Sequence, residues 1–383
     1  MIPPQLTRVT RALPFRGGGG IFTKTIQTST EPFKVLFFGR DEFSCLVLKE
    51  LHASRDVWQS LDIATQPDMK VGRRGSKLSV SPLKVLGEEY RLPVHTIPPD
   101  KPSFRHWQLP PPFIPTPSPD PTHLLITASF GRILPKRMLD VFAPSRRLNV
   151  HPSLLPSYRG PAPMQHALIN GEKKTGVSVI GMTEYKKGID TGEIWREAEF
   201  PITEDTDFPS LRDQLGVIGG RLLVSVMRDM LAGTAKAVPQ REDPSAPRAP
   251  LITAQDALVD PSSMTSEEVV RRHRAISHQK PLFAYLQTGR TLQLHDVKSR
   301  KSSPDELGRL VLSEAGYAIF YPPSRALLVR CANDTLLEVS RVKQQDRSLI
   351  TAKEWWNGVT PDMRAVRGAD SGPVVLTARE TAT

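Results

Sequence analysis

The chain has 383 residues and a formal net charge of +11, with 51 Lys and Arg against 40 Asp and Glu. This length exceeds what one hydrophobic core usually supports, so we expect two domains. The positive excess favours a polyanionic partner such as a nucleic acid. The 2 cysteines form no Cys-x-x-Cys pair, which argues against a disulfide framework and a bound metal. Because no run of about 18 apolar residues occurs, we expect a soluble protein with no membrane partner.

The first segment, residues 1–31, has the composition of a transit peptide. It holds 4 Lys and Arg residues, several Ser and Thr residues, and no acidic residue before Glu31. A basic, hydroxyl-rich and acid-poor start is typical of organelle targeting. We therefore expect a protein of the mitochondrial matrix, the alternative being an ordinary disordered basic start.

The next segment, residues 32–238, alternates strand and helix patterns. It opens with an apolar run, Phe33 to Gly39, followed by a helical pattern that continues to Leu51. Further strands are expected at Val57–Thr65, Pro93–Ile97, Leu124–Ser129, Arg147–His151, Thr175–Met182 and Gly192–Phe200, and further helices at Pro82–Tyr90 and Leu211–Leu231. Such alternation predicts an α/β fold with a doubly wound, mainly parallel sheet. The turn at Gly39 lacks the Gly-x-Gly-x-x-Gly pattern, which argues against a dinucleotide cofactor.

Proline-rich segments interrupt this pattern. Residues 98–121 contain 10 prolines, which exclude a central strand or a helix interior, so we expect an extended surface insert. Residues 239–254 are polar and proline-rich and are expected to form a semi-rigid linker. A small β-rich domain should follow over residues 255–360, and a disordered tail over residues 361–383. The expected elements of that domain are a helix at Ser266–Ser277 and strands at Thr291–Val297, Arg309–Leu312, Ala326–Cys331 and Thr335–Val342.

Three polar residues form the candidate site. Asn149 and His151 are two positions apart on an expected strand, hence on one face. Pro152 disfavours the helical region for His151 and so keeps the strand end extended. Asp190 lies in a Gly-Ile-Asp-Thr-Gly turn. Taken singly, a histidine at a strand end is commonly structural and an aspartate in such a turn commonly forms the turn, so the combination carries the prediction.

The sequence around these residues resembles the folate-dependent formyltransferases. Their shared pattern is an Asn-x-His strand end, a Ser-Leu-Leu-Pro loop and an Asp-Thr-Gly turn, matched here within Leu148–Gln165 and Thr175–Ile194. Leu125–Leu139 is similar to the strand and pterin-facing loop of that family. Gln66–Leu78 and the second domain as a whole resemble the branch that acts on methionyl-tRNA. Glycinamide ribonucleotide formyltransferase modules lack such a second domain.

The resemblance implies a fold and a reaction. The fold is a formyltransferase-type Rossmann-like domain followed by a C-terminal, OB-like β-barrel that binds tRNA. The reaction moves a formyl group from the co-substrate 10-formyltetrahydrofolate to the α-amine of initiator methionyl-tRNA, for translation initiation, without a metal. Asn149 and His151 would donate hydrogen bonds to the oxyanion, and Asp190 would relay a proton and keep His151 charged. We expect the enzyme to be a monomer.

The resemblance also implies binding residues. The folate would be bordered by two loops, formed by Ser153, Leu154, Leu155 and Pro156 and by Gly131, Ile133 and Leu134. For the leucines, core packing is the alternative. A basic loop would bind tRNA through phosphate contacts by Arg73, Arg74 and Lys77. More positive charge in the second domain comes from Arg271, Arg272, Arg274 and Lys280.

Two other functions stay open from the sequence. One is formyl transfer to a small amine such as glycinamide ribonucleotide or an amino sugar. The other is a non-catalytic relative that binds folate or RNA. The presence of Asn149, His151 and Asp190 argues against the second alternative.

Overall fold

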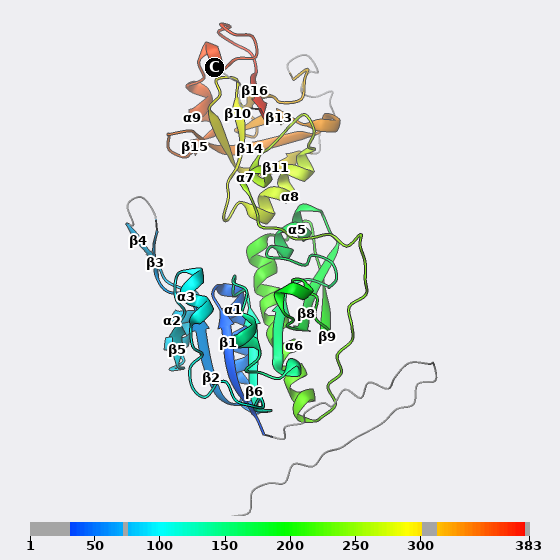
Figure 1. The fold of residues 1–383 in the computed structure, drawn as a ribbon. Coiled ribbons are helices and arrows are strands. Elements are labelled where there is room, and N and C mark those ends of the chain that lie inside the picture. Colours follow the sequence, from blue (N-terminus) through cyan, green and yellow to red (C-terminus); the bar gives the residue numbers. More distant parts are fainter. Residues whose placement is uncertain (1–30, 72–75, 301–311, 380–383) are drawn as a thin grey trace, which may run out of the picture. The chain divides into compact units, whose positions relative to one another are not determined.

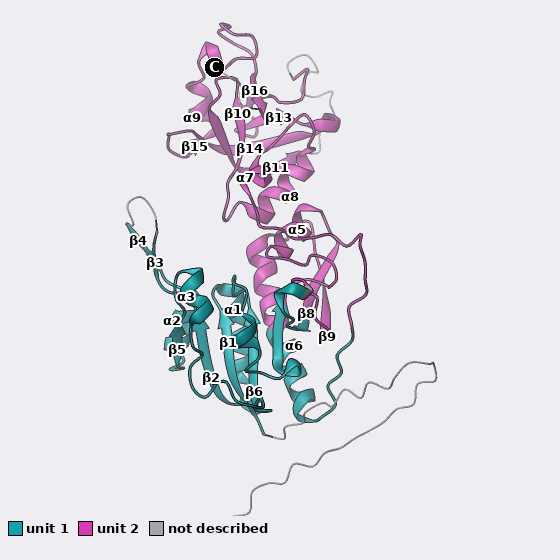
Figure 2. Ribbon diagram, viewed as in Figure 1, with its two compact units in different colours: residues 1–150, 179–186, 220–238 teal, residues 151–178, 187–219, 239–383 magenta. Residues whose placement is uncertain are grey.

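The computed structural model describes residues 31–71, 76–300 and 312–379 (Figure 1). The expected transit peptide, except for Glu31, lies outside these residues. The chain divides into two compact units, shown in Figure 2. Unit 1 comprises residues 1–150, 179–186 and 220–238, and unit 2 comprises residues 151–178, 187–219 and 239–383. The expected domain bounds remain a prediction.

A mainly parallel sheet underlies the first half of the chain. Among the described residues its order is β5-β2-β1-β6-β7-β8-β9, and each neighbouring pair from β5 to β7 is parallel. Its strands are β1 (Phe33–Gly39), β2 (Trp58–Thr65), β5 (Val94–Thr96), β6 (His123–Ala128), β7 (Arg147–His151), β8 (Lys174–Gly181) and β9 (Ile194–Pro201). Six of the seven β1 residues are buried, as expected of a parallel strand covered on both faces. The doubly wound α/β fold is confirmed.

Helices α1 (Glu42–Ala53) and α2 (Pro82–Glu89) lie side by side on one face of this sheet. They contact each other, and they contact strands β6, β2 and β5. Asp41 caps α1 by accepting a hydrogen bond from the Ser44 backbone at 3.2 Å. The second half of α6 (Phe208–Leu231) lies against α1, where Gly220 faces the Val47 backbone.

The proline-rich segment, residues 98–121, adds a few buried side chains to the core beside this sheet, while most of its residues are exposed. Its interpretation as a surface insert remains a prediction. Phe104 and Phe113 are buried in a cluster with Phe38 of β1. Phe104 belongs to a short helix, α3 (Lys101–His106), in which Pro102 occupies the first turn, where proline is tolerated. The prolines exclude long regular elements, but the apolar residues between them still pack on the sheet.

The C-terminal domain is a closed antiparallel barrel. Within the described residues six strands close it in the order β11-β10-β16-β12-β13-β14, with β14 pairing back to β11 and a short β15 added at its side. The strands are β10 (Leu282–Leu286), β11 (Thr291–Arg300), β12 (Tyr317–Tyr321), β13 (Ala326–Arg330), β14 (Leu336–Gln344), β15 (Ile350–Thr351) and β16 (Val374–Thr377). The expected β-barrel is confirmed. Of the strand expected at Arg309–Leu312, residues 309–311 lie outside the described part.

The tail contains the last strand of this barrel. β16 pairs with both β10 and β12, and its residues Val374 and Leu376 are buried. The expectation of disorder is therefore wrong for residues 361–379. Four residues are too few to show a periodicity, and pairing with distant strands decides their conformation.

Shorter elements complete the chain. They are a hairpin of β3 (Met69–Val71) and β4 (Lys77–Ser79), and the helices α4 (Lys136–Leu139), α5 (Pro163–Ile169), α7 (Ala254–Ala257), α8 (Ser266–Ile276) and α9 (Ala352–Asn357). A capping box, formed by Thr265 and Glu268, begins α8. Helix α8 packs on α5 within unit 2.

Candidate active site

Strand β7 presents the first two candidate residues. Leu148 and Val150 are buried on one face of the strand, so Asn149 and His151 share the other. The neighbouring strand β6 places Thr127 opposite Asn149, and its hydroxyl donates a hydrogen bond to Asn149 Oδ1 at 2.7 Å. This bond sets the orientation of the amide, with Oδ1 toward Thr127 and the Nδ2 donor group on the opposite side.

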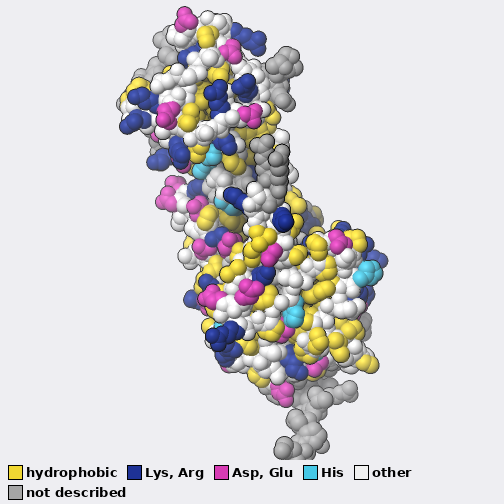
Figure 3. Space-filling model, turned by 90° about the vertical axis from the view of Figure 1, so that its left-hand side faces the viewer, with side chains coloured by type: hydrophobic (Ala, Val, Ile, Leu, Met, Phe, Trp, Pro, Cys, Tyr) yellow, Lys and Arg dark blue, Asp and Glu magenta, His cyan; other side chains and the backbone are white. Residues whose placement is uncertain are grey.

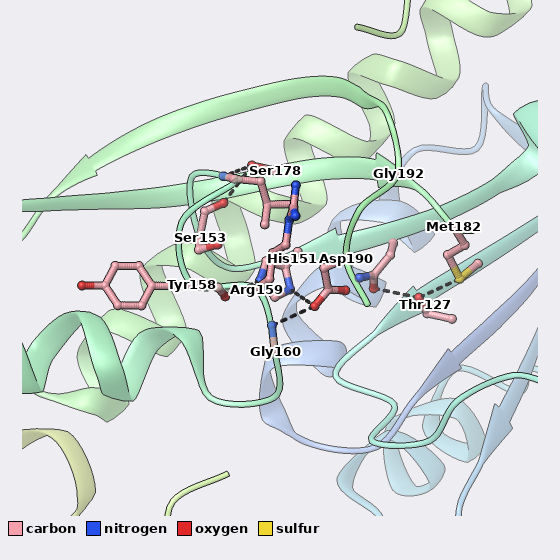
Figure 4. Close-up of polar contacts among 12 residues, drawn as sticks. Thr127, His151, Ser153, Tyr158, Arg159, Gly160, Ser178, Met182, Asp190 and Gly192 are labelled. Atoms are coloured by element: carbon pink, nitrogen blue, oxygen red, sulfur yellow. Dashed lines mark hydrogen bonds and ion pairs between the residues drawn. The ribbon is translucent and has the colours of Figure 1, made fainter. Parts of the chain in front are cut away.

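His151 lies at the end of β7 and is buried. Its Nε2 atom is 3.0 Å from the Tyr158 carbonyl oxygen, and its Nδ1 atom is 3.7 Å from Asp190 Oδ2 (Figure 4). Because a carbonyl oxygen only accepts, Nε2 must carry a proton. A proton on Nδ1 then makes the ring a cation paired with the Asp190 carboxylate. Each ring nitrogen therefore faces a protein oxygen in this conformation.

Asp190 lies in the turn between β8 and β9. Its backbone has a φ of 54°, in the left-handed region that few residues other than glycine adopt. The Gly160 backbone N–H donates to Asp190 Oδ2 at 3.0 Å. In Figure 4 the carboxylate of Asp190 points toward the ring of His151 and toward Gly160. Sequence reasoning paired Asp190 with His151, and the structure brings them together.

The loop after β7 holds both members of this pair. Tyr158 accepts from His151 through its carbonyl, and its own φ of 61° is an outlier for a bulky residue. Its hydroxyl donates to Glu172 Oε1 at 2.5 Å. Burial, with a further contribution from the hydrogen bond to Glu172, raises the pKa of Tyr158 to about 12. The strained backbone thus has an anchored side chain, an arrangement that clusters at functional sites.

The Ser-Leu-Leu-Pro segment, expected at the folate, faces the protein interior with three of its side chains. Ser153 is fully buried and donates to the Ser157 carbonyl at 2.8 Å. Leu155 is buried, and Leu154 packs where a side chain on Gly176 would otherwise lie. Core packing therefore accounts for Leu155, whereas Leu154 is half-buried. Folate contact by Ser153 to Pro156 remains a prediction.

The second loop expected at the folate follows β6. Strand order reverses between β1 and β6, and ligands of such sheets bind in the crevice outside the carboxyl ends of these strands. Leu134 is buried in the core, whereas Ile133 is 54% exposed. Gly131 has a φ of 75°, and the buried Gln66 side chain donates to the Phe130 carbonyl at 3.0 Å. Gly131 and Ile133 thus belong to a braced loop.

A half-buried carboxyl, that of Asp41, lies just after the end of β1. Burial raises the pKa of Asp41, while hydrogen bonds from the Ser44 backbone and the Ser129 hydroxyl oppose the shift. Ser129, with a φ of 46°, is the first residue after β6. The Asp41 carboxyl, which the sequence suggested only as a helix cap, therefore lies next to the first residue after β6.

The basic residues expected to bind tRNA are only partly visible. Arg73 and Arg74 lie outside the described residues, and Lys77 is an exposed residue at the start of β4. In the second domain, Arg271 and Arg272 donate to backbone carbonyls of Ile169 and Asp256. Those two side chains therefore contribute to folding.

Three residues of the site were not predicted from the sequence. Thr127 orients Asn149, and Arg159 lies between the two residues that hold the His151–Asp190 pair. Gln240, in the expected linker, donates to the backbone carbonyls of Asp190 and Gly192. A hydroxyl residue within the buried apolar strand β6, paired with Asn149 of β7, could have indicated Thr127. Gln240 is distant in sequence from its partners and gives no local signal.

Comparison with known proteins agrees with the fold. Residues 33–227 match the formyl transferase family and residues 251–360 match the formyl transferase C-terminal domain. Methionyl-tRNA formyltransferase of Syntrophus aciditrophicus is 36% identical over 281 residues, covering 72% of this chain and 84% of that protein. The Lactiplantibacillus plantarum enzyme of the same name is 30% identical, covering 85% and 95%. The mouse mitochondrial methionyl-tRNA formyltransferase is 30% identical, covering 85% and 78%.

Solved structures share the fold at lower identity. A sugar 3N-formyltransferase, crystallised with dTDP and 5-N-formyl-tetrahydrofolate, has a TM-score of 0.55 at 14% identity and covers 83% of this chain and 100% of its own. An N-formyltransferase of Helicobacter canadensis, in complex with folinic acid and dTDP-3-aminofucose, has a TM-score of 0.55 at 16% identity, covering 80% and 98%. Parallel sheet, carboxyl-end site and family match together define an α/β group-transfer enzyme. The chain belongs to the formyl transferase family.

Among the described residues, no group of His, Cys, Asp and Glu is arranged to hold a metal ion. In the same part of the chain, every helix is too short or too polar to cross a membrane.

Proposed function

We propose that this protein transfers the formyl group of 10-formyltetrahydrofolate to the α-amine of initiator methionyl-tRNA. The observation that carries the proposal is the buried His151–Asp190 pair, held by the Tyr158 carbonyl and the Gly160 N–H beside Asn149 on β7. The relatives named methionyl-tRNA formyltransferase align with most of this chain. Since one of them is mitochondrial, we also propose the mitochondrial matrix as its location.

Asn149 would stabilise the negative charge of the reaction. Attack of an amine on a formyl carbon turns the carbonyl oxygen into an oxyanion, which needs a fixed hydrogen-bond donor. The Thr127 hydroxyl occupies Asn149 Oδ1, so the amide presents Nδ2 on its other side. A donor that is oriented before the reaction costs little reorganisation when the charge appears.

His151 and Asp190 would move the proton. The attacking amine must lose one proton, and the departing folate nitrogen must gain one. Because the Tyr158 carbonyl holds Nε2–H, the exchangeable proton of the ring lies at Nδ1, on the side of Asp190. We therefore assign proton transfer to the pair and the oxyanion contact to Asn149.

We place the folate at the carboxyl ends of β1 and β6, where the strand order reverses. Bound there, the folate supplies a formyl group that is already activated for transfer. Gly131 and Ile133 form a loop braced by Gln66, and the exposed Ile133 side chain offers an apolar surface. The half-buried carboxyl of Asp41, beside Ser129 after β6, is a polar group that can accept a hydrogen bond from a heterocycle N–H. These features support residues of the second predicted loop as folate contacts.

The outer face of the barrel fits a polyanion. On β14, Arg341 and Lys343 alternate with buried Val342, and they lie opposite His295 and Gln293 of β11. Lys and Arg side chains are spread over the face of the C-terminal domain seen in Figure 3. Such a surface positions a nucleic acid through its phosphates. It supports tRNA as the acceptor, together with Lys77 and the predicted loop at Arg73 and Arg74.

The test is a formylation assay with the full-length protein. Purified protein is incubated with 10-formyltetrahydrofolate and, in parallel reactions, methionyl-tRNA, free methionine, glycinamide ribonucleotide or a dTDP-amino sugar. We expect formyl transfer to methionyl-tRNA alone, and weaker transfer as salt rises because phosphate contacts are screened. Transfer to a small amine at a higher rate than to methionyl-tRNA would contradict the proposed acceptor.

A further inference from the structure

The segment between the two family regions is bound to the site loop. Residues 239–250, which we call the strap, run beside the loop from Tyr158 to Ala162 within unit 2. The Tyr158 N–H donates to the Pro247 carbonyl at 2.6 Å, and the Ala249 N–H donates to the Arg159 carbonyl at 3.0 Å. The Ala162 N–H donates to the Ala249 carbonyl at 3.2 Å, and Ala249 is fully buried. The expected linker is therefore fixed at the C-terminal end of the strap.

At its other end the strap is fixed by one side chain, Gln240. Its Nε2 atom donates to the Asp190 carbonyl at 2.8 Å and to the Gly192 carbonyl at 2.7 Å. Its Oε1 atom accepts from the Arg159 guanidinium, from Nε at 3.0 Å and also from Nη2. The amide thus donates to the turn that carries Asp190 and accepts from the loop that holds His151.

These bonds converge on the catalytic pair. Arg159 lies between Tyr158, whose carbonyl holds His151 Nε2, and Gly160, whose N–H holds Asp190 Oδ2. Gly160 has a φ of 126°, and a Cβ atom there would be 2.5 Å from the Ala249 carbonyl oxygen of the strap. The loop is therefore enclosed between the pair on one side and the strap on the other.

We infer that Gln240 is a positioning residue for the His151–Asp190 pair, and that the strap supports the active-site loop as well as connecting the domains. Gln240 sets the separation between the Asp190 turn and the Arg159 loop, and it acts on the reaction through them. This inference rests on the proposed function for its kinetic test and on the geometry alone for its spectroscopic test.

Glutamine suits this place because its amide combines both kinds of group. A Gln240→Glu change keeps the length and the acceptor for Arg159, but it sets a carboxylate oxygen against two backbone carbonyls. A Gln240→Ala change removes all four contacts. If only the Arg159 contact matters, Gln240→Glu will behave as wild type. If the donors to the Asp190 turn matter, both variants will fail.

The experiment compares Gln240→Glu and Gln240→Ala with Glu242→Ala, a truncation of an exposed residue in the same strap. The full-length proteins are assayed for formyl transfer to methionyl-tRNA and for thermal melting. Displacement of catalytic groups by about 1 Å can cost about 100-fold in rate, so we expect kcat to fall 10- to 100-fold in both Gln240 variants. KM for both substrates and the cooperative melting transition should stay close to wild type, and Glu242→Ala should match wild type throughout.

A second readout does not depend on the acceptor. Nitrogen-15 labelling of histidine gives the imidazole signals of His151, assigned by their loss in His151→Gln. We expect the protected Nε2–H signal, which reports the bond to Tyr158, to shift or broaden in both Gln240 variants and to persist in Glu242→Ala. This test still decides the inference if the wild-type protein proves to formylate another amine.

Two results would overturn the inference. One is an unchanged kcat together with an unchanged His151 signal in both Gln240 variants. The other is a kcat loss that occurs only with loss of cooperative melting and an equal loss of substrate binding, because that pattern describes a purely structural contact.

Discussion

Two histidine–aspartate pairs lie at opposite ends of neighbouring parallel strands. His123 is the first residue of β6 and His151 is the last residue of β7. Both rings are buried, and each has a carboxylate at similar distance, 3.5 Å for Asp120 and 3.7 Å for Asp190. Composition and distance alone therefore do not distinguish a structural pair from a catalytic one.

Their surroundings differ. The ring of His123 packs edge-on against Phe113 at 5.1 Å, and the side chain of Asp120 is 39% exposed. Burial lowers the pKa of His123, while Asp120 partly opposes this shift. Around His151, backbone groups of the loop hold both partners, and the Asp190 side chain is only 14% exposed. The carboxyl end of the sheet thus supplies oriented polar groups, whereas the amino end supplies an apolar packing site.

The largest loss of kcat is expected when the pair at the carboxyl end is broken. Asp190→Asn keeps the side-chain shape but removes the charge that pairs with His151. General acid–base groups typically contribute about 10²–10⁴-fold, so kcat for formyl transfer should fall within that range. The matched control is Asp120→Asn at the other pair, which should leave kcat unchanged. Equal losses in both variants would remove the distinction between the two ends.

The next effect concerns Asn149. Asn149→Ala removes the amide donor, and loss of one oxyanion donor typically costs about 10²–10³-fold in kcat. Steady-state kinetics with both substrates should show this loss with little change in KM, because the contact strengthens only as charge develops. A higher KM with kcat intact would instead assign Asn149 to substrate binding.

A smaller effect is expected from the residue that orients Asn149. Thr127→Val keeps the shape of the side chain and removes its hydroxyl donor to Asn149 Oδ1. A hydrogen bond of this kind contributes about 0.5–1.5 kcal/mol, which corresponds to a loss of about 2- to 10-fold in kcat. In the double variant with Asn149→Ala the two losses should not add. Additive losses would mean that Thr127 acts independently of the amide.

The smallest effect is expected on the pH dependence of stability, through the protonation of His123. Because its pKa in the folded state is lowered, the unfolded state binds the proton first as pH falls below about 6.5. The pair therefore destabilises the fold on acidification, by at most about 1.4 kcal/mol per pH unit. In His123→Phe, urea unfolding between pH 7 and pH 5 should show a shallower fall in stability. A fall as steep as that of wild type would assign the acid sensitivity to other groups.

The sequence predicts the site best where the partners are local. The alternation of β7 places Asn149 and His151 on one face, and the glycines around Asp190 indicate its turn. Features that depend on distant partners were missed or misjudged. β16 becomes a strand only through β10 and β12, and Gln240 is defined by carbonyls some fifty residues away in the sequence.

The proline-rich segment shows the same limit in another form. Its prolines correctly exclude long strands and helices, yet Phe104 and Phe113 bury as deeply as residues of the sheet. Local conformation was therefore predicted, and packing was not. Since packing depends on which surfaces are left uncovered by the rest of the chain, composition alone cannot decide it.

The central claim is that formyl transfer depends on the pair at the carboxyl end of the sheet. The most direct measurement is single-turnover transfer of a radiolabelled formyl group from 10-formyltetrahydrofolate to methionyl-tRNA by wild type, Asp190→Asn and Asp120→Asn. We predict rapid transfer by wild type and Asp120→Asn, and transfer at least about 100-fold slower by Asp190→Asn. A wild-type rate in Asp190→Asn, with normal binding of both substrates, would contradict the account.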